Sequence, residues 1–244
     1  MSPSSHATLR CAFALLAAAG MSLNAQAPGF GTSQPFHAVV LTTGLTTMST
    51  DPLAVFLTKN GFSGLSTDGI SYGASGYFAF GRALLGADYV RTTFGEEGSS
   101  SGRTDDLNSQ QLAATFSFAV LATGRLNVFP TLGVGRGTID VTLRTRSGTA
   151  ASAAQPTFDE VAQNPGPEAT LSGSHLLYTV GGGADYLITK GAPDHAGIVF
   201  GVRAGIALAP NRTTWTVGGR PVISGPDASA GGPFLRVVVG LGAR

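Results

Sequence analysis

The chain has 244 residues, of which 12% are charged, 43% are hydrophobic and 35 are glycine. A soluble domain carries about a quarter charged residues, so this low charge favours a protein whose outer face meets lipid. Apart from Arg10, the chain carries 14 basic and 14 acidic residues, and this neutrality gives no sign of a nucleic-acid partner.

The first residues have the pattern of a secretory signal peptide over 1–27. Arg10 supplies a positive flank, residues 11–23 are mostly apolar, and Ala25-Gln26-Ala27 is a small-x-small cleavage pattern. Pro28 hinders cleavage directly before it, so cleavage after residue 25 stays open beside cleavage after residue 27.

After the signal we expect a short lead over 28–35 and one domain over 36–244. No later stretch approaches the roughly 18 consecutive apolar residues of a membrane helix. Strands cross lipid only as a closed barrel, because unpaired backbone groups in hydrocarbon cost several kcal/mol each. Cys11, the only cysteine, lies in the signal, so we expect neither a disulfide nor a thiolate site in the mature chain.

Eight strand-like segments follow, joined alternately by short and long connections. This asymmetry is typical of an all-β, antiparallel, up-and-down transmembrane barrel with short periplasmic turns and long extracellular loops. Each segment reaches the roughly 9 to 11 residues that a tilted spanning strand needs. The predicted strands are 36–48, 69–80, 83–94, 109–121, 126–146, 173–189, 197–213 and 233–242, and the long connections are 49–68, 95–108, 147–172 and 214–232.

Alternation along the segments predicts which face meets lipid. Within 69–80, Ile70, Tyr72 and Phe78 share one face and Ser71 lies on the other. A soluble lipocalin-like barrel, which remains an alternative, lines its interior with bulky apolar side chains. We instead expect an apolar outside and an interior that is small or polar throughout.

The hairpin between the second and third segments has a well-specified register. If Gly81 and Arg82 form a two-residue turn, Phe80 pairs with Ala83 and both strands turn the same apolar set outward. A slip by one residue would move half of that set to the inside.

The segment 126–146 has a fault in its pattern. Apolar residues occupy even positions up to Val134 and odd positions from Ile139 onward. We expect either a bulge at 135–137 or a strand that leaves the membrane there.

The long connections are rich in Gly, Ser, Thr, Pro and Ala, so we expect them to be poorly packed and mobile. Within the first, Asp51 followed by Pro52 indicates an N-cap and a first helical residue, and Gly61 indicates a stop. A helix over 52–59 would serve as a lid, as an interfacial anchor, or only to shorten the loop.

Three segments resemble the small outer-membrane barrels of the OmpA and OmpX type found in Gram-negative bacteria. They are Phe129-Pro130-Thr131-Leu132-Gly133-Val134-Gly135, Gly181-Gly182-Gly183-Ala184-Asp185-Tyr186 and Val202-Arg203-Ala204-Gly205. The resemblance implies a place in the outer membrane and insertion by the barrel-assembly machinery. Members commonly end on an aromatic residue, whereas this chain ends Gly242-Ala243-Arg244.

Four inward charges give the sharpest chemical signal. We expect Asp185, Arg203 and Arg236 to form one patch, with Asp88 approaching from across the lumen. An eight-stranded barrel is just wide enough to be filled by side chains, so these charges would pair into a plug, with a gate as the alternative.

Enzymatic chemistry is not expected. His175 and Asp185 lie ten residues apart on one strand, about 33 Å, which is too far for a catalytic dyad. His37 and His195 fall near the strand ends and are more simply solvated. We expect no metal and no cofactor.

A second set of charges falls near the predicted outer rim. Arg91, Arg144, Arg146 and Arg212 are candidates to contact lipopolysaccharide phosphates, directly or through divalent cations, and Glu96, Glu97, Asp105 and Asp106 lie nearby in sequence. The alternative is a solvated loop base.

The sequence therefore predicts a monomeric, non-enzymatic barrel in the outer membrane with a plugged lumen. It would act in envelope structure or in surface interaction through its loops, with lipid and lipopolysaccharide as neighbours. A narrow passive pore for small solutes is the alternative function.

Overall fold

The computed structural model describes residues 36–62, 65–95, 97–98, 103–123, 125–145, 150, 155–189, 196–210 and 213–243. The predicted signal peptide and lead lie outside these residues. In the part that is described, no helix is long and apolar enough to cross a membrane.

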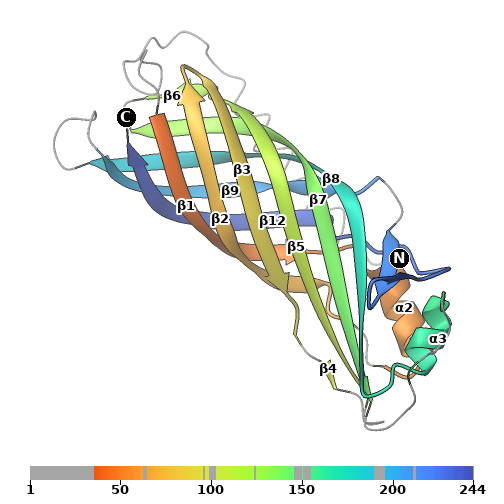
Figure 1. The fold of residues 1–244 in the computed structure, drawn as a ribbon. Coiled ribbons are helices and arrows are strands. Elements are labelled where there is room, and N and C mark those ends of the chain that lie inside the picture. The colour runs from red at the N-terminus through yellow and green to blue at the C-terminus, as the bar shows by residue number, and fades with distance from the viewer. Residues whose placement is uncertain are drawn as a thin grey trace, which may run out of the picture.

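Eight long strands form a closed antiparallel barrel, which confirms the predicted fold (Figure 1). Each strand pairs with the next, and the last pairs with the first. The strands are β1 (Phe36–Thr47), β2 (Asp68–Phe80), β3 (Ala83–Thr93), β5 (Arg103–Phe118), β7 (Leu126–Thr145), β8 (Glu168–Thr189), β9 (Gly197–Leu208) and β12 (Gly232–Ala243).

Three of these strands differ from the prediction by several residues at one or both ends, and the other strands differ by a residue or so. β5 begins six residues earlier than expected and β8 begins five residues earlier, whereas β9 ends at Leu208. Short strands add to the sheet, namely β4 (Glu97–Gly98) on β5, β6 (Leu121–Ala122) on β7, β10 (Thr214–Val217) on β8, and β11 (Arg220–Pro221) on β10.

The register of the β2–β3 hairpin is the predicted one. Phe80 pairs with Ala83 and Phe78 with Leu85. Gly81 has a φ of +59°, a conformation that glycine adopts without the penalty a side chain would bring.

The outer surface of the barrel is a belt of exposed apolar side chains. Leu41 is 69% exposed, Phe80 is 61% exposed and Leu241 is 70% exposed. In water such a belt would be unstable, so the soluble alternative is wrong and the barrel lies in the outer membrane with this face in lipid.

The sequence predicts an interior that is small or polar throughout, and the structure shows that this prediction is wrong. At the end with the short turns, apolar side chains fill the lumen, and we call this cluster the floor: Phe36, Ala38, Val40, Tyr77, Ala79, Leu84, Ala119, Phe129, Leu187, Val199 and Val238. The expectation failed because a small barrel closes its lumen by side-chain packing, and apolar groups pack there without needing partners.

The fault in the pattern of β7 has a simple cause. Pairing with β5 and β8 continues without interruption, so there is no bulge. Even residues point outward all along: Leu132, in the belt, is 59% exposed. Ile139 and Leu143 point inward and are fully buried. The strand leaves the membrane. Within the membrane its apolar residues point outward to lipid, and beyond the membrane they point inward to other apolar side chains of the protein.

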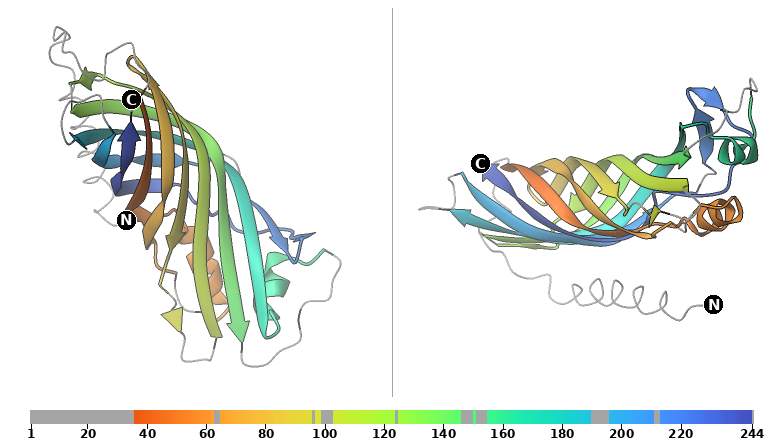
Figure 2. Two further views of the ribbon diagram at one scale, coloured as in Figure 1. Left: turned by 60° about the vertical axis from the view of Figure 1, so that its left-hand side comes forward. Right: turned by 90° about the horizontal axis from the view of Figure 1, so that it is seen from below.

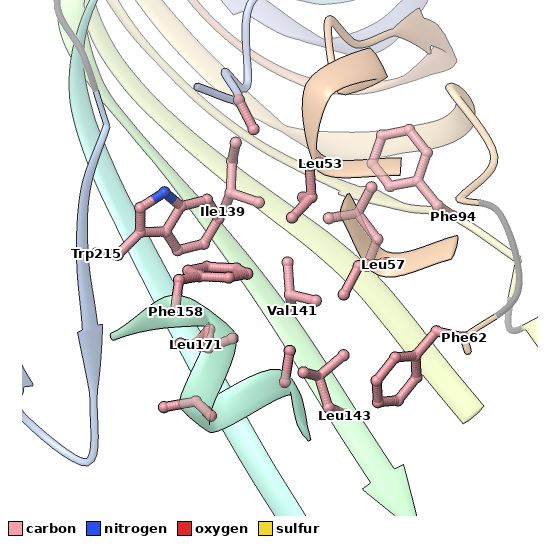
Figure 3. Packing of buried hydrophobic residues seen from close by; sticks show 14 of the residues in the cluster. Leu53, Leu57, Phe62, Phe94, Ile139, Val141, Leu143, Phe158, Leu171 and Trp215 are labelled. Atoms are coloured by element: carbon pink, nitrogen blue, oxygen red, sulfur yellow. The ribbon is translucent and has the colours of Figure 1, made fainter. Parts of the chain in front are cut away.

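Those inward residues belong to a second core beyond the belt, which we call the cap core (Figure 3). It joins strand residues to two helices, α2 (Asp51–Lys59) and α3 (Phe158–Gln163), and to β10. Both views in Figure 2 show the helices beyond one end of the barrel, opposite the end of β12. The expectation of poorly packed connections is therefore wrong for these segments, because each contributes large side chains to one shared core.

The two helices begin differently. The helix expected over 52–59 is present, but Asp51 is its first residue and not its N-cap, and Thr50 at the N-cap makes no side-chain capping bond. Leu53 and Leu57 are fully buried, so α2 packs in the cap core. The unpredicted α3 has a capping box in which Thr157 and Glu160 each bond the other's backbone N–H.

Candidate functional site

Asp185 lies at the centre of a polar network in the lumen. It points inward from β8 and is 1% exposed. Arg203 on the neighbouring strand β9 donates from Nη1 to Oδ1 at 2.6 Å and from Nη2 to Oδ2 at 2.8 Å. This bidentate geometry satisfies both carboxylate oxygens and is the strong form of an arginine–carboxylate contact.

A third residue extends this network across the barrel. The Tyr77 hydroxyl donates to Asp185 Oδ2 at 2.7 Å. Tyr77 is on β2, which lies four strands from β8 in either direction around the barrel, so the bond joins opposite walls. The Arg203 guanidinium also lies 4.7 Å from the ring centre of Phe129 on β7.

Sequence reasoning missed Tyr77. The available signal was that this aromatic residue sits among the inward positions of its strand, where Ser71, Gly73 and Ser75 are small.

Arg236 and Asp88 share a small chamber above this network. Arg236 pairs with Arg203 in the strand register and lies 4.2 Å over the ring of Phe234. Its Nε and Nη2 are buried without a hydrogen-bond partner among the described residues. Asp88 lines the same chamber, of about 70 Å³, but forms no ion pair with Arg236. The structure thus brings Asp185 and Arg203 into contact and leaves Asp88 and Arg236 apart.

The segment 228–231, which we call the mouth segment, crosses the lumen at the loop end. Gln111 on β5 donates its amide to the Ala230 carbonyl at 2.6 Å, and the Ala230 N–H donates to His175 Nε2 on β8 at 3.0 Å. The Ser229 N–H donates to the Ser49 carbonyl and the Ser49 N–H donates to the Gly231 carbonyl, both at 3.2 Å. These bonds attach the mouth segment to the chain just after β1.

Of the four candidate rim arginines, the structure describes two, and these two lie on different strands. Arg91 points outward from β3, and Arg144 forms an ion pair with Glu168 at 2.9 Å. Arg146 and Arg212 lie outside the described residues.

Of the nearby acidic residues, Asp105 and Asp106 are described with their side chains, and Glu97 pairs with Asp105 through the backbone. Asp105 is buried, and Asp106 accepts a hydrogen bond from Asn108 at 3.1 Å. Glu96 and the Glu97 side chain are outside the described part of the chain.

Of His37 and His195, the structure describes only the first. His37 is exposed at the short-turn end, where its ring lies 6.4 Å from that of Phe78, and His195 is outside the described residues. Among the residues that are described, no group of three or more His, Cys, Asp or Glu is placed to hold a metal ion.

Comparison with known proteins gives structural likeness only. No family model and no curated protein matches the chain. Neisserial surface protein A (NspA) is similar over 86% of this chain and 98% of its own, with 13% identity and a TM-score of 0.44. The outer membrane protease OmpT from Escherichia coli is similar over 86% and 96%, with 8% identity and a TM-score of 0.38. The translocator domain of autotransporter NalP from Neisseria meningitidis is similar over 98% and 95%, with 12% identity and a TM-score of 0.31.

Proposed function

We propose that this protein is a non-conducting, non-enzymatic outer-membrane barrel that presents a folded cap outside the cell. In this role it acts in envelope structure or surface interaction, and the barrel serves as the cap's anchor. The observation that carries the proposal is the Tyr77–Asp185–Arg203 network, which crosses the lumen between opposite walls.

Three successive layers support a closed lumen. The floor fills the short-turn end with apolar side chains. The network of Asp185 spans the middle, and the mouth segment is bonded to β5 and β8 at the loop end. A solute would have to displace all three layers to pass.

Bilayer recordings test the closed lumen. We expect purified wild-type protein to give no stable open channels, and we expect liposomes containing it not to swell in small sugars. Boiled and unboiled samples run on SDS gels control for folding. Stable channels in the folded wild-type protein would contradict the proposal and favour the narrow passive pore.

Cysteine labelling tests the exposure of the cap, since the lone Cys11 lies in the predicted signal. Val55 in α2 is 71% exposed, and Arg82 lies in the short turn at the opposite end. On intact cells, a membrane-impermeant maleimide should label Val55→Cys and should label the control Arg82→Cys only after the outer membrane is permeabilised. The reverse pattern would place the cap in the periplasm and end the proposal.

A further inference from the structure

Two outward-pointing arginines lie on one wall of the barrel, at the loop-side edge of the apolar belt. They are Arg91 on β3 and Arg136 on β7, and β5 runs between them. Gln110 of β5 pairs directly with Arg91, and its neighbour Leu112 pairs with Arg136. The register therefore places Gln110 directly beside Arg91 and diagonally across from Arg136, on the same outer face.

On β7 and β8 the belt ends at this height. Toward the membrane, Tyr89 follows on β3 and Val134 on β7, and both are exposed. Away from the membrane, the outward positions become polar, as with Thr138, Ser174 and Asp140. Tyrosine at the edge of a belt marks the level of the lipid headgroups, so the two arginines lie where lipid phosphates lie.

Neither arginine has an anionic partner within the described part of the chain. Arg136 is exposed, and Arg91 is half-buried with its Nε lacking a hydrogen-bond partner. Arg144, by contrast, is paired with Glu168 and lies eight residues beyond Arg136, about 26 Å along the strand. It is too distant to share a headgroup with them.

The distribution around the barrel is one-sided. The outward residues at the loop-side ends of the other walls are uncharged or acidic, as with Leu208, Pro233, Thr47 and Asp68. Only the wall β3–β5–β7 carries outward cations at this level among the described strand residues, so any headgroup bound there would take one fixed side of the protein.

We propose that Arg91, Gln110 and Arg136 form a binding site for a lipid A phosphate of lipopolysaccharide. The two guanidinium groups donate to the phosphate oxygens, the Gln110 amide donates a further hydrogen bond, and the acyl chains lie along the belt below Tyr89. This site rests on the position of the barrel in the outer membrane and not on the closed lumen or the cap. It replaces the four-arginine set expected from the sequence, which omitted Arg136.

Binding of purified lipopolysaccharide to the full mature protein tests the site. The probe is lipopolysaccharide with phosphorylated lipid A, measured by native mass spectrometry in detergent. We expect Arg91→Gln with Arg136→Gln to weaken binding about tenfold or more, since charge-assisted bonds to phosphate are lost. The matched control, Arg82→Gln with Arg125→Gln at the short-turn end, removes the same charge and should bind like wild type.

Two further arms identify the contact. Dephosphorylated lipopolysaccharide should bind wild type and the double variant equally, and added chelator should leave wild-type binding to the phosphorylated form intact. Equal binding of the phosphorylated form by wild type and the folded double variant would overturn the site. Loss of wild-type binding on chelation would overturn direct contact in favour of bridging divalent cations.

Discussion

The two halves of the β7–β8 hairpin have the same pairing and opposite polarity. In the belt, the outward residues Leu132 and Val134 face lipid and the inward neighbours are small or polar. Beyond Arg136 the outward residues are polar, while Ile139, Val141 and Leu143 face the cap core. The backbone pairing continues without a break. The change in which face is apolar therefore reflects a change of environment, from lipid to protein, and not a change of strand geometry.

We expect that a substitution which destabilises one half leaves the other half folded. Trp215 is in the cap core, where its ring packs on Phe158 at 5.1 Å and its Nε1 donates to the Pro226 carbonyl at 2.9 Å. Trp215→Ala should destabilise the cap by about 3 to 5 kcal/mol and leave the barrel folded. Limited proteolysis of the folded protein should cut the cap faster, while the SDS-gel shift on boiling stays.

The matched control is Val55→Ala, since Val55 is exposed on the cap. It should leave the proteolysis rate near that of wild type. Loss of the gel shift in Trp215→Ala would show that the two halves unfold together.

In the membrane-spanning half, we expect the largest effect on stability in the Tyr77–Asp185–Arg203 network. Asp185→Asn leaves the half-buried Arg203 without its carboxylate and should cost the barrel about 3 to 5 kcal/mol in denaturant unfolding from lipid vesicles. Removing both charges, with Asp185→Asn and Arg203→Met, should recover part of that loss. A double variant less stable than the single one would contradict the assignment of the cost to an unpaired charge.

One substitution placed at two heights of β7 separates the halves directly. Leu132→Arg puts a charge into the belt and should cost about 2 to 4 kcal/mol, whereas Thr142→Arg, also outward but beyond the belt, should change stability by less than about 0.5 kcal/mol. Vesicle unfolding curves measure both. Equal costs would mean that the belt does not end near Arg136.

The smallest expected effect tests the local structure of the cap. Thr157→Ala removes the capping box of α3 and should destabilise this helix by about 1 kcal/mol. Amide hydrogen exchange should rise in α3 and stay unchanged in the barrel strands. Unchanged exchange in α3 would mean that packing of Phe158 alone holds the helix.

Local patterns were sufficient to predict the barrel. Strand number, the β2–β3 register and the lipid-facing side followed from alternation and turn chemistry, because each depends on residues close in the sequence. The switch of apolar residues from even to odd positions in β7 is also visible in the sequence, which allows either a bulge or a strand that leaves the membrane. Only the structure shows that Ile139 has the cap core beside it.

Contacts between distant segments could not be predicted in the same way. The bond of Tyr77 to Asp185 depends on the strand count and tilt that bring opposite walls together, and no pattern within β2 contains that information. The cap core combines side chains from several connections. Each connection taken alone has the composition of a loosely packed loop, so the sequence does not predict that they share a core. The capping box of Thr157 and Glu160 is a local exception, since its Thr-x-x-Glu pattern is visible in the sequence and indicates the start of α3.

The cap core is built from segments that lie far apart in the sequence. Leu53, Phe158 and Trp215 come from three separate connections, and they meet only on the inner side of the hairpin. The pairing of Ser49 with Ser229 extends the β1–β12 seam, which joins residues as far apart as His37 and Ala243. Contacts of such long sequence separation form late, since loop closure must come first. We therefore expect the cap core to be complete only when both ends of the chain are in place, so protection of the cap from protease should accompany closure of the seam.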